Sequence, residues 1–347
     1  MFPNLYTILV GRPGIGKGSA INPVVSLINE AKICNILSDR VTIEYVLERM
    51  SNGWQVFRRS GTGGLTLQQD HTALLISPEV SVFIGASQNT LPILADLWDA
   101  REGEFVYGTR HKGEFRIKDP CVCLLGGSTQ EWLIASIPAN AVGGGFTRRV
   151  NFVVANDRER LLPWPVLQNH NQVRDNLVTD LRSISLLSGE MKFDPAAVPL
   201  FEQCYIDSSP KEYDDEATTS YKTSMWAQVT KLSMCLSASR GDSLVISDQD
   251  FRLATDAVKI VAENIPRVFR GVGESDLVIA SDKVLKFLEL KGYASKTELL
   301  RALWRDVTSE DLDKILATFK EASIVYEYQQ GRKTMFALVV KNTKGTP

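Results

Sequence analysis

The sequence lacks several features that would place it quickly in a class. Its five cysteines are odd in number and form no C-x-x-C pair, which argues against a disulfide framework and against a zinc site. No apolar run approaches the roughly 20 residues of a membrane span, and the amino terminus lacks the charged-then-apolar layout of a signal peptide. We therefore expect a reduced, cytoplasmic protein with no membrane partner.

The chain also lacks a large net charge of either sign. The formal net charge is −2, so no global basic field predicts nucleic-acid binding, and such contacts must come from local patches. The sequence contains no internal repeat and no long low-complexity segment. With 347 residues, of which 44% are hydrophobic and 23% charged, the chain can bury a sizeable core in two or three domains.

A glycine-rich loop follows the first apolar run, in the stretch LYTILVGRPGIGKGSAI at residues 5–21. LYTILV is typical of a buried strand, GRPGIGK fits the phosphate-binding pattern G-x-x-x-x-G-K, and the residues that follow have helical spacing. In such a loop the backbone N–H groups and the helix dipole hold phosphates, and the lysine reaches the β and γ oxygens. The predicted nucleotide-binding residues are Gly11, Gly14, Gly16, Lys17, Gly18 and Ser19.

The residues expected around a metal ion depart from the usual pattern. Where Ser or Thr normally follows the lysine, this chain has Gly18, and the hydroxyl comes one residue later at Ser19. A second buried run ends in Ser77-Pro78-Glu79, where strands of this kind usually end in Asp-Glu. Glu79 takes the water-activating place, and Pro78 stands where the aspartate that organises the metal is expected. We predict ATP and Mg²⁺ as cofactors, with Ser19 and Glu79 as metal ligands.

Two further segments carry polar chemistry. Residues 104–117 alternate apolar and polar side chains on either side of a basic tip, Arg110, His111 and Lys112, which predicts a β-hairpin. The hairpin is either a DNA-contacting element or a solvent-exposed turn enriched in charge. The buried run CVCLLGGST then ends at Thr129, which can orient a water molecule or contact the γ-phosphate.

Two arginines precede a further buried run, VNFVV. Arg148 and Arg149 follow a glycine-rich stretch, and they are either solvated surface charges or arginine fingers that reach the phosphate site of a neighbouring subunit. Such a finger accelerates hydrolysis by about 10³-fold or more. The predicted catalytic residues are Glu79, Thr129, Arg149 and, in second place, Arg148.

The order of these parts resembles that of AAA+ helicases of the superfamily three and minichromosome-maintenance type. GFTRRVNF looks like the SRF arginine-finger segment of the latter, with Arg149 at the matching position. More closely, residues 5–155 and, more weakly, 220–262 resemble phage- and plasmid-encoded replication ATPases of helicase type. The resemblance implies that Arg110, His111 and Lys112 contact DNA phosphates in a central channel.

The same resemblance implies the partners and the place of action. It implies a homo-oligomer, as a rule a hexamer, that acts on single-stranded or forked DNA with a primase or another replication protein as a further partner. It also implies the cytoplasm of a bacterial or archaeal host cell as the location. The fold class that it implies is α/β, an AAA+ core with a central parallel sheet flanked by helices, followed by a helical lid and a carboxyl-terminal winged-helix domain.

The patterning predicts three parts along the chain. They are an ATPase core at 1–162, a helical lid region at 163–275 and a winged-helix domain at 276–347. In the lid region, Lys222 or Lys231 is either a cation for the nucleotide or an ordinary surface lysine. The predicted helix N-caps are Ser247 or Asp248, Ser281, Ser295, and Thr308 or Ser309.

Three functions stay open from the sequence. The first is an ATP-driven DNA helicase that acts in replication of a phage or plasmid-like element. The alternative is an AAA+ initiator or loader ATPase, whose ATP binding assembles a ring and which binds DNA without unwinding it. A third, a nucleotide kinase, is indicated by the glycine after Lys17, which resembles adenylate kinases, but the acceptor-nucleotide and lid segments of such kinases are not found.

Overall fold

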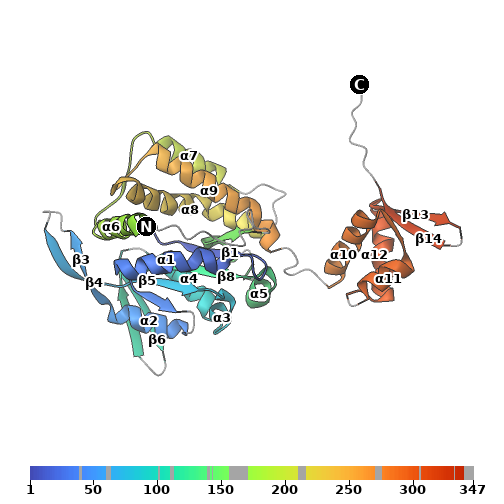
Figure 1. Ribbon diagram of the computed structural model, residues 1–347, viewed down its shortest axis with the longest axis horizontal. Coiled ribbons are helices and arrows are strands. Elements are labelled where there is room, and N and C mark those ends of the chain that lie inside the picture. Colours follow the sequence, from blue (N-terminus) through green and yellow to red (C-terminus); the bar gives the residue numbers. More distant parts are fainter. Residues whose placement is uncertain are drawn as a thin grey trace. The chain divides into compact units, whose positions relative to one another are not determined.

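The computed structural model divides the chain into two compact units, residues 1–270 and 271–347 (Figure 1). It describes residues 1–38, 41–59, 64–100, 102–109, 113–138, 141–142, 144–155, 171–209, 216–269, 276–304, 306–331 and 333–339. The core–lid boundary predicted at residue 163 lies outside the described residues, as do Arg110, His111 and Lys112. The three-part division therefore stays a prediction.

A five-stranded parallel sheet in the order β2-β5-β8-β1-β9 forms the centre of the first unit (Figure 1). Its strands are β1 (Tyr6–Val10), β2 (Ile36–Ser38), β5 (Thr72–Ser77), β8 (Cys121–Ser128) and β9 (Val150–Val154). Strands buried on both faces are apolar along most of their length, which is why the sequence marks them as continuous apolar runs. The predicted α/β core with a central parallel sheet is confirmed.

Helices connect these strands and follow them. Between the strands lie α1 (Lys17–Ala31), α2 (Ile43–Asn52), α3 (Val80–Ile84), α4 (Thr90–Trp98) and α5 (Gln130–Ser136). After β9 come α6 (Asn171–Ser185), α7 (Val198–Asp207), α8 (Glu216–Gly241) and α9 (Asp248–Val268), together with the short parallel pair β10 (Lys192–Phe193) and β11 (Val245–Ile246).

These later helices form a layer, here called the helical layer (α6–α9), in which α7, α8 and α9 pack together (Figure 1). α9 packs on β9, where Phe152 and Phe269 meet edge to face with their centroids 5.1 Å apart. α8 packs on the arginine turn, the 3₁₀ helix η2 (Thr147–Arg149) that precedes β9. The helical layer therefore packs on β9 and on the turn that precedes it.

Two antiparallel hairpins lie outside the central sheet. β6 (Glu104–Thr109) and β7 (Gly113–Lys118) form the hairpin predicted from alternation, and Phe115 and Ile117 are buried where β7 contacts α2. β3 (Trp54–Arg59) and β4 (Leu65–Asp70) form a hairpin that extends from the body of the unit in Figure 1. The sequence pattern does not predict this second hairpin, whose Phe57, Leu65 and Leu67 are exposed.

The second unit has three helices and a small antiparallel sheet. Its elements are α10 (Asp276–Lys291), β12 (Tyr293–Ser295), α11 (Lys296–Leu303), α12 (Ser309–Glu321), β13 (Val325–Gln330) and β14 (Lys333–Leu338), and the strand order is β12-β14-β13. One apolar core, to which all three helices and the sheet contribute, lies within this unit. Gly331, where the hairpin turn is predicted, has a left-handed φ of 66°.

Most of the predicted helix caps are confirmed. Ser247 and Ser295 each form a capping box with the acidic residue three positions on, and Thr308 accepts from the N–H of Asp311. The cap predicted at Ser281 is wrong, because α10 begins at Asp276. The Ser281 hydroxyl lies inside the helix and donates to the carbonyl of Leu277, one turn back, so a polar residue in an apolar pattern does not mark a helix start here.

Gly127, near the end of β8, allows the loop after β5 to approach closely. A Cβ at this position would lie 2.9 Å from the backbone oxygen of Pro78, which cannot shift without moving Glu79. We expect Gly127→Ala to lower the free energy of unfolding by about 1–3 kcal/mol, the usual cost of overpacking. Chemical denaturation measures this effect.

Gly18→Ala is the matched control for that substitution. No atom lies within 4 Å of a Cβ at this position, which is in the first turn of α1. Alanine is favoured over glycine inside a helix by about 0.5–1 kcal/mol, so this variant should keep or gain stability. Equal denaturation midpoints for the two variants would contradict the close approach at Gly127.

Candidate functional site

The glycine loop, residues 11–16 between β1 and α1, has the backbone that its sequence pattern requires. Gly14 and Gly16 have φ of 79° and 107°, values that L side chains rarely adopt. A Cβ on Gly11 would lie 2.7 Å from the backbone oxygen of Ala155, which excludes a larger residue. α1 begins at Lys17, and the first N–H groups of a helix have no partner within it and carry partial positive charge. The loop is therefore built to hold an anion.

Lys17 folds back over this loop. Its Nζ donates to the backbone oxygen of Gly11 at 2.6 Å and to that of Arg12 at 3.3 Å. Ser19 is exposed, and at about 100° per residue it lies about 160° around α1 from the buried Ile21. The displaced hydroxyl is thus on the side of α1 that faces away from the sheet.

Glu79 lies two residues after the end of β5, at the edge of the sheet where the parallel strands end, here called the carboxyl edge. Its Oε1 accepts from the hydroxyls of Ser128, at 3.1 Å, and Ser81, at 2.8 Å. Ser128 is the last residue of β8 and pairs with Val10, the last residue of β1, so Glu79 and the glycine loop share this edge. The bond from Ser128 to Glu79 is a feature that the sequence analysis missed, although both residues follow buried runs.

The carboxyl edge offers few ligands for a metal ion. Thr129 is buried and caps α5 by accepting from the N–H of Trp132 at 3.3 Å, which leaves its hydroxyl proton free to donate. Among the described residues, no group of three or more His, Cys, Asp or Glu could hold a metal. The described residues at this edge include the carboxylate of Glu79 and the hydroxyls of Ser77 and Ser128. This set suits Mg²⁺, which keeps several waters and takes phosphate oxygens with one or two carboxylates.

Arg148 and Arg149 lie at the opposite edge of the sheet, here called the amino edge. They directly precede Val150, the first residue of β9, which pairs in parallel with Tyr6, the first residue of β1. A five-residue strand spans about 16 Å, so at least this length separates the arginine turn from the glycine loop. Within one chain, the arginines and the glycine loop do not form a single site.

Arg149 is engaged inside its own chain. Its side chain is only 6% exposed, forms a salt bridge with Asp99 and donates to the backbone oxygen of Gly145. Its guanidinium carbon lies 5.8 Å from the centroid of the Trp98 ring. Its Nε is buried without a hydrogen-bond partner in the described part of the chain. These contacts fasten the arginine turn to the end of α4.

Arg148 is the more accessible of the two arginines. It is half-buried, and its Nη1 donates to Ser224 Oγ of α8 at 3.0 Å. Burial and the neighbouring Arg149 lower the pKa of Arg148. Because Asp99 pairs with Arg149, Arg148 has no carboxylate partner among the residues that the structure describes. Asp99 also favours the charged form of Arg148 but forms its salt bridge with Arg149, so the Arg148 guanidinium can accept an anion from outside as a direct partner.

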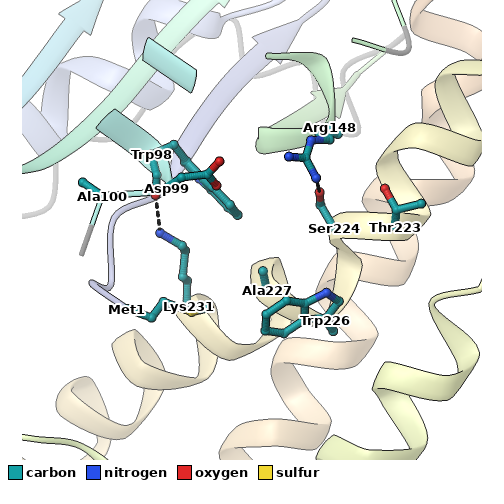
Figure 2. A pocket seen from close by; sticks show the side chains of 10 residues that line it. All are labelled: Met1, Trp98, Asp99, Ala100, Arg148, Thr223, Ser224, Trp226, Ala227 and Lys231. Carbon is teal, nitrogen blue, oxygen red and sulfur yellow. Dashed lines mark hydrogen bonds between the residues drawn. The ribbon is translucent and has the colours of Figure 1, made fainter. Parts of the chain in front are cut away.

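Arg148 lines a pocket of about 370 Å³ at the amino edge, between the end of α4 and one face of α8 (Figure 2). Lys231 and Asp99 also line it, and the Trp98 and Trp226 rings form apolar parts of the wall. The pocket therefore carries more positive than negative charge, which suits an anionic group.

Lys231 is buried, so the interpretation of this residue as an ordinary surface lysine is wrong. Its Nζ donates to the side-chain oxygen of Asn4 and, at 2.9 Å, to the backbone oxygen of Trp98, and it lies 4.1 Å from the centroid of the Trp98 ring. Burial lowers its pKa from 10.5 to about 8. Lys231 joins α8 to the residues before β1 and to the end of α4 (Figure 2).

Comparisons with known proteins give a distant structural likeness. No family model matches the sequence, and no curated protein matches it. The structure is similar to that of a full-length MCM homologue from Methanopyrus kandleri, with a TM-score of 0.40 and 13% identity over 75% of this chain and 51% of that chain. This chain spans about half the length of that protein, and so distant a likeness carries no argument about function. No helix in the described ranges is long and apolar enough to cross a membrane.

Lys231 predicts a specific pH dependence of stability. Below about pH 8 both the folded and the unfolded chain bind its proton, whereas between its folded pKa of about 8 and its unfolded value of 10.5 only the unfolded chain does. Stability then rises with pH, because the unfolded state binds more protons. We expect the free energy of unfolding, relative to that of Lys231→Met, to increase by about 2 kcal/mol between about pH 7.5 and about pH 9.5.

Denaturant titrations of both proteins at both pH values measure this difference. The comparison with Lys231→Met removes the contributions of titratable groups that do not interact with Lys231, whereas changes in the pKa values of Cys121, Cys123 and Cys235, which do interact with it, are part of the measured difference. A difference that stays constant or shrinks as the pH rises would show that the buried ammonium keeps its ordinary pKa.

Proposed function

We propose that this chain is an ATP hydrolase of the AAA+ type whose active sites form between neighbouring copies. The observation that carries the proposal is the separation of Lys17 and Glu79, at the carboxyl edge, from Arg148 at the amino edge, which forms no salt bridge within the described part of the chain. In a head-to-tail ring, the amino edge of one copy can face the carboxyl edge of the next. Each site then holds the loop and carboxylate of one copy and the arginine of its neighbour.

Within such a site the residues of the carboxyl edge act on the phosphates and on water. Lys17 exchanges the backbone oxygens of Gly11 and Arg12 for phosphate oxygens, and the N–H groups of the glycine loop hold the rest of the chain of phosphates. Glu79, held by two hydroxyls, accepts a hydrogen bond from the attacking water and orients it. Thr129 donates to the γ-phosphate.

Mg²⁺, when bound, neutralises the charge that develops on the phosphates. We propose Glu79 as the carboxylate that holds it together with phosphate oxygens and waters. Ser19, exposed on the far side of α1, contributes through water.

We assign the role in trans to Arg148 and a supporting role to Arg149. To reach a neighbour, the buried Arg149 side chain would have to leave its salt bridge with the half-exposed Asp99, its hydrogen bond to Gly145 and its contact with the Trp98 ring. Arg148 uses Nη1 for its bond to the hydroxyl of Ser224, and it can keep this bond while its other N–H donors face the neighbouring copy. An added guanidinium then stabilises the charge on the transferred phosphoryl group.

We further propose that hydrolysis drives movement along single-stranded or forked DNA in replication of a phage or plasmid-like element. The hairpin β6–β7 supports this role: its base is fixed by the burial of Phe115 and Ile117, and its sequence places three basic residues at the tip. A hexamer would bring six such tips, Arg110 to Lys112, to one channel. A primase or another replication protein is the partner that fits this activity.

The second unit has the element order of a winged helix, which serves DNA binding or protein docking. Lys296 pairs with Asp313, Lys320 pairs with Glu327, and α12 begins with acidic residues such as Glu310. Paired lysines and an acidic helix start oppose contact with phosphates. We therefore propose protein docking for this unit, which weakens the alternative of an initiator whose winged helix recognises DNA.

Mixing two inactive variants tests the shared site. Lys17→Ala and Arg148→Ala should each lower hydrolysis by about 10³-fold or more. When the two are mixed, sites form from the loop of one variant and the arginine of the other, so the rate should recover to about a quarter of that of the unmodified chain. Hydrolysis by the mixture, measured at saturating ATP, decides the proposal.

The matched control replaces Lys17→Ala in the mixture by Lys17→Ala/Arg148→Ala, which has no arginine to supply and should restore nothing. Full activity of Arg148→Ala alone, or a mixture that stays inactive while both variants assemble, would overturn the shared site.

Substitution of the hairpin tip tests the link to DNA. Arg110→Ala/Lys112→Ala should weaken binding of single-stranded DNA and reduce the slope of log K against log salt by about 1.4, the value for two phosphate contacts. Hydrolysis without DNA should persist, and strand displacement on a forked substrate should be lost.

Arg116→Ala is the matched control, because Arg116 lies on the same hairpin but pairs with Glu104 and Glu114. It removes a charge that carboxylates already balance, so DNA binding should change little. An unmodified chain that hydrolyses ATP but displaces no strand would favour the initiator or loader instead.

A further inference from the structure

A line of buried polar side chains connects α8 to the arginine turn. The hydroxyl of Tyr221 donates to Asn151 Oδ1 at 2.8 Å, and Asn151 Nδ2 donates to Gln228 Oε1 at 3.0 Å. Gln228 Nε2 in turn donates to the backbone oxygen of Arg148 at 3.4 Å. Tyr221 and Gln228 belong to α8 and Asn151 to β9, and all three are buried. We call these three residues the relay.

A second contact reaches the side chain of the same arginine. Ser224 Oγ of α8 accepts from Arg148 Nη1 at 3.0 Å (Figure 2). Tyr221, Ser224 and Gln228 are three and four residues apart, so they lie on one face of α8. This one face therefore holds both the backbone and the guanidinium of Arg148.

The polar character of this face is unusual for a helix packed on a sheet. Such a face is ordinarily apolar, because burying polar groups costs free energy unless each finds a hydrogen-bond partner. Here Tyr221, Asn151 and Gln228 satisfy one another, and a fully satisfied buried network specifies one relative position of its members. Movement of α8 relative to β9 would break these hydrogen bonds. An apolar interface between the two elements would allow small shifts without such a loss.

The helical layer also contacts α1 of its own chain, at the end of that helix that is remote from the glycine loop. Arg182 of α6 donates to the backbone oxygens of Glu30 and Ala31, the last residues of α1, at 3.1 Å and 3.4 Å. α6 contacts α8 as well. The helix that starts at the glycine loop and the helix that holds Arg148 are therefore joined by one packed layer.

We propose that the relay and Ser224 are positioning residues: through them, the position of α8 determines the orientation of the Arg148 guanidinium. Displacement of α8 in one copy then changes hydrolysis in the neighbouring copy, whose phosphates Arg148 contacts. The inference rests on the proposed role of Arg148 in trans. It adds a regulatory input to that role: the site of each copy responds to the helical layer of its neighbour.

The test uses the mixing experiment with an altered arginine donor. Lys17→Ala supplies Arg148 to the loop of Arg148→Ala, so substitutions added to Lys17→Ala act only on the donated arginine. With Tyr221→Phe added, which removes one hydroxyl and keeps the ring, we expect the recovered hydrolysis to fall at least 10-fold. The KM for ATP should stay unchanged, because the loop that binds ATP belongs to the other variant.

Tyr205→Phe added to the same donor is the matched control, because Tyr205 is exposed on α7 and lies outside the relay. It should leave the recovery intact. Ser224→Ala is a second test variant, which removes the contact to the guanidinium and so keeps the proposal testable if Tyr221→Phe unfolds. We expect it to lower the recovered rate by at least 5-fold at unchanged KM.

The outcomes separate this inference from the proposed function. If Lys17→Ala alone fails to restore Arg148→Ala, the shared site itself is wrong. If Lys17→Ala restores hydrolysis and the donors carrying folded Tyr221→Phe or Ser224→Ala restore it equally well, the shared site stands and the positioning role is overturned.

Discussion

The parallel direction of the five central strands is the constraint on which the rest of this structure depends. Because all of the strands run the same way, residues that follow them gather at one edge, and residues that precede them gather at the other. Glu79 and the glycine loop belong to the first group, and the arginine turn belongs to the second. A single chain therefore cannot bring Glu79 and the arginine turn together.

Features that depend on a few adjacent residues could be predicted from the sequence. The glycine loop, the acid after β5 and the cap at Ser295 are set by local backbone geometry, and the apolar strands are set by burial on both faces. The hairpin β3–β4 escaped prediction because its apolar residues, such as Phe57, are exposed and stand among polar ones. The prediction of a helix cap at Ser281 fails for a different reason. A serine inside a helix can donate its hydroxyl to a backbone oxygen of the preceding turn, so its presence does not mark a helix start.

Pairings between distant residues could not be predicted, although the residue types were visible. Arg149 was expected to reach a neighbour, but Asp99 lies beside it once α4 and η2 pack together. Lys231 is of a residue type that usually lies on the surface. It is buried here because α8 packs against the residues before β1. The sequence shows which chemical groups each side chain carries. Which other residue each of them contacts depends on how the strands and helices are arranged.

The bond between Lys231 and Asn4 has a consequence for how the chain folds. It joins residues 227 positions apart, and β1 itself pairs with β9, which begins only at Val150. Contacts over such separations form slowly, because a long loop must close before they contribute. The glycine loop is synthesised directly after β1 but before the other strands and helices that give it shape, so it can adopt its folded form only after most of the first unit has emerged.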